Sequence, residues 1–375
     1  MEVTLFFTYD TSLKDWKSAG ILSRELSIYK KLHNENNIKF NFITYGNAED
    51  LEIDTGEGIE VYPLYKKRKR SNYKFVKIFK SLMIPFFFRD IIRNSSILKT
   101  NQLKGCWVGL ISKTFFKKPL IVRTGYDLMQ WSIFQDKNKF NRTIVKQITK
   151  HAIKISDQYN VSSDIDSMFL KSSFKNLNTN NIQLRPNFID ISIFTDMESE
   201  RNKEILLVGR LEDQKNLEFI IKEYENFNLP KLNIVGDGSK KNYLLNQINS
   251  KSLNIEYHGK VLNNKLTYFY NKFEFYLIAS HYEGNPKSLL EAMACGNVVI
   301  GSNVTGINNI IKHRENGLLF DLEYGNLSKQ INLILDGSYD LNILKLNSIK
   351  FIKETHSLNE LSKLELNDYR TILND

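Results

Sequence analysis

The sequence predicts an α/β protein of two domains, and three observations lead to this prediction. At 375 residues the chain is too long for one ordinary core. In the second half, strand-like runs alternate regularly with helical segments, which is typical of a parallel, doubly wound sheet. A short apolar run at 275–280 leads through a tight turn into a helix. Corners of this strand–turn–helix kind are where open α/β sheets bind ligands.

That corner contains two acidic residues beside an expected helix start. Its sequence at 281–296 is HYEGNPKSLLEAMACG. We expect Asn285 to cap a helix of about three turns, with Pro286 at its first position and Gly296 at its end. Glu283 on the turn and Glu291 in the helix would frame backbone N–H groups that favour anions. Taken alone, two such glutamates could equally lie on a solvated helix surface.

The string E-G-N-P-x-x-x-x-E-A-M-A-x-G resembles the signature of the family-four glycosyltransferases, retaining enzymes of the GT-B fold that use nucleotide sugars. The resemblance is strong over roughly 200–335 and weak over the first half. It implies two Rossmann-like, doubly wound domains that face each other across a cleft. We therefore expect an N-terminal acceptor-binding domain, a C-terminal nucleotide-sugar-binding domain and a C-terminal helix that packs back on the first domain, at 1–195, 196–350 and 351–375.

Two cations follow the strand expected at 205–208. Arg210 and Lys215 have the spacing at which this family places an Arg and a Lys on the donor's diphosphate. Breaking the sugar–phosphate bond leaves a nucleoside diphosphate, and fixed cations stabilise the charge that gathers on its oxygens. Outside this match, the two residues would be ordinary surface cations on a loop. The resemblance also implies that Glu283 holds the sugar hydroxyls and that Glu291 holds the ribose hydroxyls.

The resemblance assigns further residues to the donor and to the reaction. The strand and loop at 255–261 correspond to the segment whose backbone reads the base, and we expect His258 to pack beneath that loop rather than to act as a base. The residues implied for donor binding are Gly20, Arg210, Lys215, Lys260, Val261, Glu283, Gly284, Asn285, Pro286, Lys287 and Glu291. The residues implied for catalysis are Arg210, Lys215, Glu283 and Asp127.

Two of these residues lie in the first half of the chain. Gly20 resembles the glycine that lets substrate approach the backbone of the acceptor domain. An ordinary turn glycine would look the same. Asp127 belongs to a Tyr-Asp pair where many members have His-Asp, so its role is carried over by position only. The Pro-Asn-Phe segment at 186–188 resembles the family's Pro-Asn-Gly hinge between domains, with Phe188 in place of the glycine.

The sequence offers one motif with metal-ligand spacing, Asp164-Ile165-Asp166. Because it opens an expected helix, where acidic residues are favourable anyway, we interpret it as structural. The resemblance implies a reaction without a metal or another cofactor, in which the two cations and a helix N-terminus neutralise the leaving group. The donor would be a UDP- or GDP-sugar, bound as a substrate.

Positive charge is concentrated in part of the first half. Residues 61–150 contain 21 Lys and Arg against three acidic residues, a net charge of +18, whereas the rest of the chain carries 31 basic and 39 acidic side chains. Such a local excess favours an anionic partner, and nucleic acid and an anionic membrane surface are both candidates. Aromatic and basic residues are not clearly interleaved as in single-strand binding platforms, which disfavours nucleic acid.

A basic amphipathic helix is expected within this segment. Its apolar face comprises Phe75, Val76, Phe79, Leu82 and Met83, while lysines lie off that face and the basic run 66–70 precedes it. Pro85 is expected to end or kink the helix. Such a helix can lie in a membrane interface, where each basic residue near anionic lipid adds about 1 kcal/mol of attraction. It can equally pack on the sheet with its lysines solvated.

Cysteine usage and apolar runs indicate a reducing compartment and no membrane span. Cys106 and Cys295 are the only cysteines, so the sequence contains neither a disulfide framework nor zinc spacing. The first ten residues are typical of a buried strand and lack the pattern of a signal peptide. The longest apolar run, 82–88, is far too short to cross a bilayer. We expect a cytoplasmic protein that associates peripherally with the inner face of the membrane.

Together these features predict a retaining hexosyltransferase that moves a sugar from a nucleotide sugar to a glycan acceptor. A lipid-linked acceptor, in cell-surface polysaccharide or glycoconjugate assembly, would suit the basic segment; a soluble oligosaccharide is the other possibility. Two alternatives stay open at this point: an enzyme of the same fold that glycosylates nucleic acid, and a non-catalytic sugar-binding protein. The first predicts salt-sensitive DNA binding. The second predicts no turnover of any nucleotide sugar.

Overall fold

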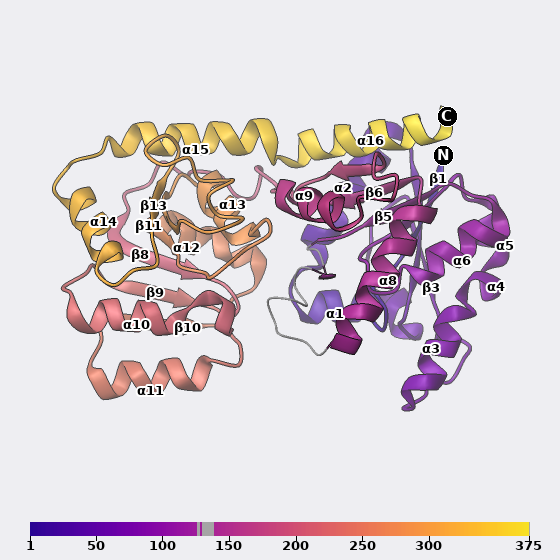
Figure 1. Cartoon of the computed structure of the whole chain (residues 1–375), viewed down its shortest axis with the longest axis horizontal. Helices are drawn as coiled ribbons and strands as arrows, with labels where there is room; N and C mark the ends of the chain where they lie inside the picture. The colour runs from indigo at the N-terminus through magenta and orange to yellow at the C-terminus, as the bar shows by residue number, and fades with distance from the viewer. Residues whose placement is uncertain (126–127, 130–138, 375) are drawn as a thin grey trace. The chain divides into compact units, whose positions relative to one another are not determined.

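The computed structural model describes residues 1–125, 128–129 and 139–374. It divides into two compact units (Figure 1). Unit 1 comprises Met1–Pro186 and Leu361–Asp375, and unit 2 comprises Asn187–Glu360. The chain therefore passes between the units twice, at 186/187 and at 360/361, where the sequence suggested boundaries at 195 and 350. We refer to these two places as the first and second crossings.

Unit 1 is built on a parallel sheet with the strand order β3-β2-β1-β4-β5-β6-β7. The chain extends the sheet from β1 first to one side and then, from β4, to the other, so the order reverses between β1 and β4. The strands are β1 (Glu2–Phe6), β2 (Lys39–Thr44), β3 (Ile59–Pro63), β4 (Ile97–Thr100), β5 (Leu120–Arg123), β6 (Gln158–Val161) and β7 (Ile182–Leu184). This is the doubly wound arrangement that was expected.

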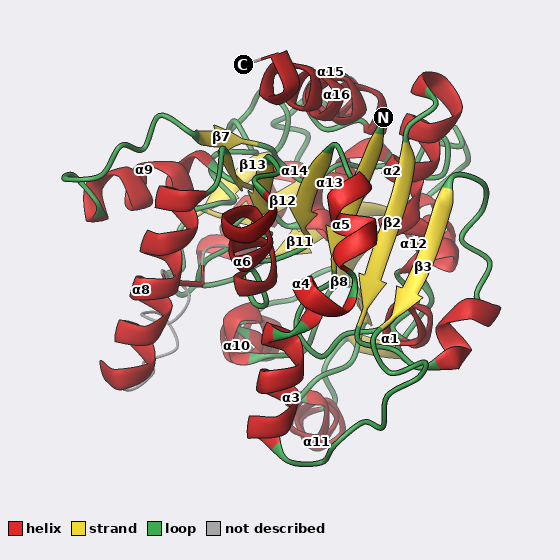
Figure 2. Ribbon diagram, turned by 90° about the vertical axis from the view of Figure 1, so that its right-hand side faces the viewer, coloured by secondary structure: helices red, strands yellow, loops and turns green. Residues whose placement is uncertain are grey.

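Helices connect these parallel strands. They are α1 (Leu13–Ser18), α2 (Leu22–Asn36), η1 (Ala48–Glu52), α3 (Lys74–Leu82), α4 (Ile84–Phe87), α5 (Arg89–Asn94), α6 (Trp107–Phe116), α8 (Lys139–Ile155), α9 (Asp164–Ser173) and α16 (Leu358–Asn374), of which the last begins at the second crossing. Pro85 stands within the first turn of α4, so the expected helix is divided there into α3 and α4. Figure 2 shows α3 projecting past the carboxyl ends of β2 and β3.

Unit 2 contains a second parallel sheet, with the order β10-β9-β8-β11-β12-β13. Its strands are β8 (Asn202–Val208), β9 (Leu232–Val235), β10 (Ile255–Gly259), β11 (Phe273–Ile278), β12 (Val298–Ser302) and β13 (Leu318–Phe320). The order reverses between β8 and β11, which makes this pair the place where a ligand is expected. The helices are η2 (Asp213–Lys215), α10 (Leu217–Asn226), α11 (Lys241–Lys251), η3 (Asn263–Lys265), α12 (Leu266–Lys272), α13 (Lys287–Ala294), α14 (Asn326–Leu335) and α15 (Leu341–Thr355).

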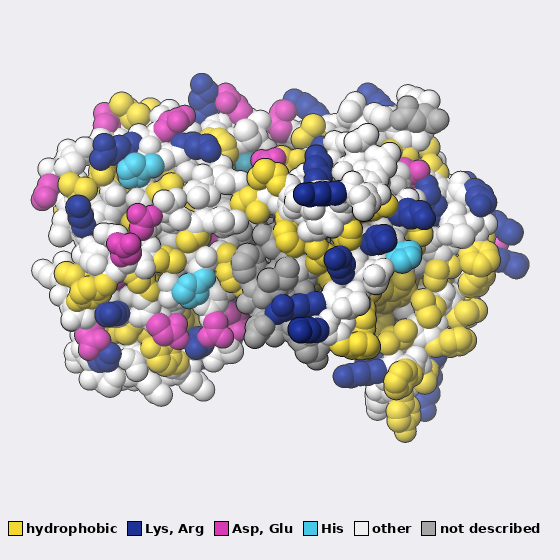
Figure 3. Space-filling view, viewed as in Figure 1, with side chains coloured by type: hydrophobic (Ala, Val, Ile, Leu, Met, Phe, Trp, Pro, Cys, Tyr) yellow, Lys and Arg dark blue, Asp and Glu magenta, His cyan; other side chains and the backbone are white. Residues whose placement is uncertain are grey.

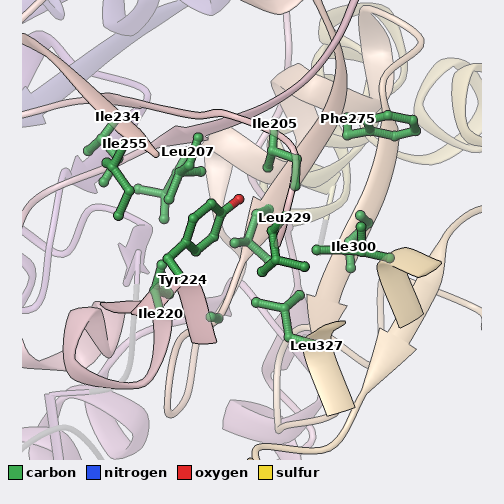
Figure 4. Close-up of a cluster of buried hydrophobic side chains, with 14 of the residues drawn as sticks. Ile205, Leu207, Ile220, Tyr224, Leu229, Ile234, Ile255, Phe275, Ile300 and Leu327 are labelled. Carbon is green, nitrogen blue, oxygen red and sulfur yellow. The ribbon is translucent and has the colours of Figure 1, made fainter. Parts of the chain in front are cut away.

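The core of unit 2 lies on both faces of its sheet. Along β8, Ile205 and Leu207 belong to one buried cluster, while Leu206 and Val208 belong to another. Successive strand residues point to opposite faces, so helices must cover both sides of this sheet. Figure 4 shows the first cluster, in which Ile220 and Tyr224 of α10 pack against the strands. The near-continuous apolar runs in the sequence reflect this two-sided burial.

The C-terminal helix α16 is attached to unit 1 by buried ion pairs. Lys99 on β4 is 1% exposed and contacts the carboxylate of Glu365, which also accepts a hydrogen bond from Tyr369. Burial opposes ionisation of Glu365, but the adjacent ammonium of Lys99 outweighs it and lowers the pKa of the carboxyl group. A second pair joins Arg185 to Asp368, with Nε donating to Oδ2 at 2.7 Å.

Candidate functional site

The candidate site lies at the carboxyl edge of the sheet in unit 2, between β8 and β11. The loop after β8 contains Arg210 and Lys215, and the loop after β11 contains Glu283. Because neighbouring parallel strands end at the same edge, residues 68 positions apart in the sequence meet there. All three residues belong to unit 2.

Lys215 and Glu283 form an ion pair at this edge. The Lys215 Nζ lies 2.6 Å from the Glu283 Oε1, and the two side chains are 14% and 9% exposed. The Ser280 hydroxyl donates to the same oxygen at 2.7 Å. Both donors therefore use Oε1, and none of the described residues donates a hydrogen bond to Oε2. The carboxylate is anchored by one oxygen and presents the other for a ligand hydroxyl.

Gln214 joins the two loops directly beside this pair. Its side-chain amide donates to the Tyr282 carbonyl at 2.7 Å, and its own carbonyl accepts from the His281 N–H at 2.9 Å. Neither Gln214 nor Ser280 was predicted from the sequence. Both stand within five residues of a candidate residue in the sequence, but only the folded loops reveal their partners.

Two glycines allow neighbouring loops to approach closely. A Cβ at Gly306, where φ is +89°, would lie 1.9 Å from the Glu283 carbonyl oxygen. A Cβ at Gly236 would lie 1.8 Å from the Gly209 carbonyl oxygen. The Glu283 N–H also donates to the Thr305 carbonyl at 3.0 Å. The loops after β8, β9, β11 and β12 are thus packed against one another, which restricts the position of Glu283.

Glu291 is buried within α13 and supported from two other helices. It is 2% exposed, accepts a hydrogen bond from the Tyr270 hydroxyl at 2.9 Å and lies 3.3 Å from the Asn263 side-chain nitrogen. Burial, reinforced by the Glu291 carboxylate, raises the pKa of Tyr270 well above its ordinary value, so the phenol stays a donor. Tyr270 and Asn263 were not anticipated from the sequence. They hold the Glu291 carboxylate in one orientation.

Arg210 and Lys260 are exposed at this edge, and Val261 is half-buried. Among the described residues, none forms a hydrogen bond or an ion pair with the Arg210 guanidinium. The two cations predicted together thus differ: Lys215 is held against Glu283, whereas Arg210 is open to a ligand. In the described part of the chain, Arg210 has only an electrostatic interaction with the nearby Glu212 carboxylate, whereas the Lys215 ammonium is already paired with Glu283.

The start of α13 differs from the prediction. Pro286 itself occupies the N-cap position, α13 is Lys287–Ala294 and Asn285 does not cap it. The Asn285 side chain instead accepts from the Asn187 N–H at 2.9 Å. The expected cap was therefore wrong, because a tertiary partner takes the Asn285 oxygen, and the eight residues of α13 make just over two turns in place of the expected three. Gly296 does end the helix, with φ +73° and its N–H donating to the Met293 carbonyl.

Backbone donors remain near the turn. The N–H groups of Gly284 and Ser288 donate to no acceptor in the described part of the chain. They lie at and just before the positive end of the α13 dipole, where anions and polar oxygens are favoured. Lys287, also in the predicted donor set, lies with its Nζ 5.8 Å from the centre of the Phe188 ring.

The structure gives a different result for each of the remaining residues that the sequence singled out. Gly20 lies in unit 1 between α1 and α2 with φ +74°, and its donor-binding role stays a prediction. Asp127 lies outside the described residues.

Asp166 follows a Ser163 cap at the start of α9, a helix that the sequence predicted there. The described residues contain no group of three metal-ligating side chains. His258 Nε2 lies 2.9 Å from the Asn233 Oδ1, and burial lowers its pKa, consistent with packing.

This part of the chain matches a known protein family. Residues 190–351 match the family model described as "Glycosyl transferases group 1". The matched region contains both loops of the site and the whole of α13. The edge described above therefore lies inside the family domain.

Two relatives illustrate the similarity in sequence. An "Uncharacterized glycosyltransferase" of Haemophilus influenzae is 28% identical over 204 residues, which cover 52% of this chain and 54% of that protein. The alignment thus spans about half the length of this relative. An N-acetylgalactosaminyltransferase of Campylobacter jejuni, whose name specifies a diphospho-undecaprenol substrate, is 28% identical over 265 residues, covering 66% of this chain and 70% of that protein.

Solved structures match the whole chain in fold. Sucrose-phosphate synthase from Thermosynechococcus elongatus has a TM-score of 0.81 at 16% identity, with both chains covered completely. Anabaena HepE in complex with UDP has a TM-score of 0.76 at 14% identity, covering 99% of this chain and 100% of that one. At these identities the likeness concerns the fold, and it confirms the GT-B class of two Rossmann-like domains.

Proposed function

Because this chain carries a domain of the group 1 glycosyl transferases, we propose that it transfers a hexose-type sugar from a nucleotide sugar to a lipid-linked glycan, with retention of configuration. One observation supports this most directly. Inside the matched domain, the two loops that follow β8 and β11 at the switch point carry an exposed guanidinium, Arg210, and an anchored carboxylate with a free oxygen, Glu283. Sugar hydroxyls need acceptors and a diphosphate needs cations, and this edge supplies both.

In the proposed reaction the bond between the sugar's anomeric carbon and the diphosphate oxygen breaks. A bond from that carbon to the acceptor oxygen forms on the same face, and the acceptor's proton passes to the departing phosphate. Arg210 and Lys215 stabilise the charge that develops on the diphosphate. Glu283 and the N–H of Gly284 orient the sugar, and Glu291 binds the ribose. A UDP-sugar is the first donor to test, since a structural neighbour binds UDP.

The test of this function is direct turnover. Purified protein is first screened by thermal shift against UDP- and GDP-sugars, because a specific ligand raises the unfolding temperature by mass action. The stabilising sugar is then offered with a polyprenyl diphosphate-linked glycan, and product is followed by mass spectrometry. Release of nucleoside diphosphate that depends on the acceptor supports the proposal. Binding without any turnover would favour a sugar-binding protein instead.

Glu291→Ala is expected to weaken donor binding rather than slow the chemical step. Ribose contacts change little between the ground state and the transition state, so their loss raises KM while kcat is largely kept. Steady-state kinetics with varied donor concentration measures this. A fall in kcat at unchanged KM would contradict the role given to Glu291. Tyr270→Phe, which removes one support of the carboxylate, should shift KM in the same direction by less.

A membrane-bound acceptor is suggested by the orientation of α3 in unit 1. Its one fully buried side chain is Ser81, which accepts from Trp107 Nε1 at 2.8 Å. Lys77 donates to Asp10 at 3.0 Å, so a lysine of this helix faces the protein. The apolar residues face outward: Phe75 is 87% and Phe79 63% exposed. This reverses the usual arrangement of a surface helix, whose apolar stripe faces the core.

The exposed apolar surface continues onto the neighbouring helices of unit 1. Phe86 on α4 and Phe115 on α6 are 40% and 63% exposed, and their rings pack edge to face at 5.1 Å. Arg68 lies 4.0 Å from the centre of the Phe87 ring. Figure 3 shows hydrophobic side chains over α3 and α4 with Lys and Arg around them. Aromatic side chains within a basic rim suit the interface of an anionic bilayer.

No helix in the described ranges has the length and hydrophobicity needed to cross a bilayer. We therefore expect reversible binding to liposomes that contain anionic lipid, weakened by salt because surface charges are screened. Neutral replacements of Lys66, Lys67, Arg68, Lys69 and Arg70 should abolish it, and Phe75→Ser with Phe79→Ser should weaken it at constant charge. Co-sedimentation measures both.

The matched control for the liposome assay removes basic residues outside this surface, such as Lys203 of unit 2. Equal binding to neutral vesicles would contradict the electrostatic part of the proposal, and no binding to either kind would assign the surface to another partner. A parallel assay with DNA at several salt concentrations tests the nucleic-acid alternative, which the comparisons do not favour.

A further inference from the structure

The Asn285 side chain, which the prediction assigned to a helix cap, has a partner at each of its two polar ends. Its Oδ1 accepts from the Asn187 N–H at 2.9 Å, and its Nδ2 lies 3.3 Å from the His356 Nε2. A backbone N–H can only donate, so the Asn187 contact defines which end of the amide is oxygen. The Nδ2 end must then donate to His356, which accepts at Nε2.

The same direction of donation continues through His356. With Nε2 accepting, the proton of the neutral ring is on Nδ1, which lies 2.7 Å from the Thr355 hydroxyl oxygen. That hydroxyl donates in turn to the Phe351 carbonyl at 2.6 Å. His356 is 7% exposed, and burial lowers its pKa to about 4, so the imidazole is neutral near pH 7. Every donor in this chain of contacts meets an acceptor.

Asn187 returns a second hydrogen bond to the same residue. Its side-chain amide donates to the Asn285 carbonyl at 2.7 Å, so backbone and side chain of residue 285 are both held. Asn187 is 8% exposed. Hydrogen bonds of this kind are costly to lose, because the buried partner is left unsatisfied.

The residues that hold Asn285 lie beside the two crossings between the units. Asn187 is the first residue of unit 2, and His356 stands four residues before Glu360, its last. The crossings are also bonded to each other, since the Ile189 N–H donates to the His356 carbonyl at 2.7 Å and the Leu358 N–H donates to the Ile189 carbonyl at 2.9 Å. Residue 285 is thus connected by hydrogen bonds to the segments beside both crossings.

On its other side, the turn is fixed to the sheet edge. Asn285 is two residues from Glu283, whose N–H is held by Thr305 and whose carboxylate is held by Lys215. A ligand that contacts Glu283 or the Gly284 N–H acts on a segment only four residues long, 283–286, which is bonded to the crossings at its far end. Hydrogen-bond networks of this kind can carry coupling free energy between two places.

We propose that Asn285, Asn187 and His356 are positioning residues: they set the 283–286 turn for the nucleotide sugar and couple occupancy of the donor site to the two crossings. This inference rests on the proposed function, whose substrate the turn would hold. None of the three is required to contact the reacting atoms. Their effect is exerted through the orientation of Glu283 and the Gly284 N–H.

The test compares donor binding in a set of variants. His356→Leu should raise the Kd for the nucleotide sugar about tenfold, the usual scale for one lost buried hydrogen bond, and Asn285→Ala, which loses two, should raise it at least as much. His356→Gln should stay within about twofold of the wild type, because its amide oxygen can replace Nε2 as the acceptor. The double variant N285A/H356L should resemble Asn285→Ala, since that substitution already removes the contact with His356. UDP-glucose and GDP-mannose serve as probes, by calorimetry, because the turn is proposed to contact the sugar.

A matched control separates positioning from simple loss of stability. Asn316 is another buried amide of unit 2, 4% exposed and bonded at both ends, yet remote in sequence from the turn. Asn316→Ala should lower the unfolding temperature without changing donor affinity. If Asn285→Ala behaves in the same way, with lower stability but unchanged Kd, the positioning role is overturned.

Hydrogen exchange tests the coupling itself. Nucleotide sugar at saturating concentration should slow exchange of the Ile189 and Leu358 amides in the wild type, and this protection should be lost in Asn285→Ala. Donor binding with no protection at either crossing would overturn the coupling. A wild-type protein that binds neither UDP-sugars nor GDP-sugars would instead refute the proposed function, so the two failures are distinguishable.

Discussion

Arg210→Ala and Lys215→Ala are each expected to lower turnover of the nucleotide sugar by about 10²-fold, the usual cost of one charge-stabilising donor at a developing anion. The leaving diphosphate gathers charge as the sugar departs, so these cations act mainly in the transition state. The loss should therefore appear in kcat and in kcat/KM together. Steady-state kinetics with the donor identified by thermal shift measures it.

The two variants should differ in stability. Arg210 is exposed and has no ion-pair partner among the described residues, so its replacement should leave the unfolding temperature unchanged. Lys215→Ala removes the partner of the Glu283 carboxylate, whose side chain is 9% exposed, and should therefore lower the unfolding temperature. Adding Glu283→Gln to Lys215→Ala should recover stability without recovering turnover. This pattern would separate the structural role of the pair from its role in the reaction.

Lys203→Ala is the matched control for this series. Lys203 is an exposed cation at the amino end of β8, whereas Arg210 and Lys215 follow its carboxyl end. Its loss should leave kcat and KM unchanged. Full activity in the Arg210→Ala, Lys215→Ala double variant would overturn the assignment of the diphosphate site.

Lys99→Met is expected to lower the free energy of unfolding of unit 1 by about 3–5 kcal/mol, the cost of leaving one member of a buried ion pair without its partner. Lys99 is 1% exposed, and the Glu365 side chain that it contacts is 14% exposed. Removing the ammonium leaves an uncompensated carboxylate between β4 and α16. Urea denaturation measures the change.

Intrinsic fluorescence makes this measurement specific to unit 1. All three tryptophans of the sequence, Trp16, Trp107 and Trp131, fall within 1–186. The variant Lys99→Met with Glu365→Gln should regain most of the stability, because the neutral amide no longer needs a cation but can still accept from Tyr369. A double variant no more stable than Lys99→Met would contradict this account.

Lys14→Ala is the surface control for the ion-pair prediction. Lys14 and Glu49 also form an ion pair, but their side chains are 61% and 49% exposed. Water already solvates both charges, so exposed pairs contribute little to stability. The urea midpoint of Lys14→Ala should therefore remain close to that of the wild type. A large shift would indicate that burial is not what distinguishes the Lys99 pair.

Features that depend on neighbours in the sequence were largely predictable from the sequence alone. The apolar runs of β8 and β11, the glycine stop at Gly296 and the strand–turn–helix corner all follow from local propensity and periodicity. The apolar face of α3 was identified in the same way. These signals are local because backbone conformation and side-chain direction are set within a few residues.

Partners far apart in the sequence were decided only by the tertiary structure. Asn285 satisfied the local rule for a helix cap, yet Asn187, 98 residues away, takes its oxygen. The buried supports of Glu291 and the Lys99–Glu365 pair, whose members stand 266 positions apart, left no local signal.

The orientation of α3 was likewise decided by partners that are distant in the sequence, although its two faces could be predicted locally. Its sequence contains an apolar face and a basic face, and either could have met the core. Lys77 reaches Asp10 after β1, and Ser81 reaches Trp107 on α6, so the polar face is bound and the apolar face is left outside. A side chain's propensity is a property of its own residue and its near neighbours. Which competing partner it meets depends on how the strands and helices are brought together, and only the folded chain decides that.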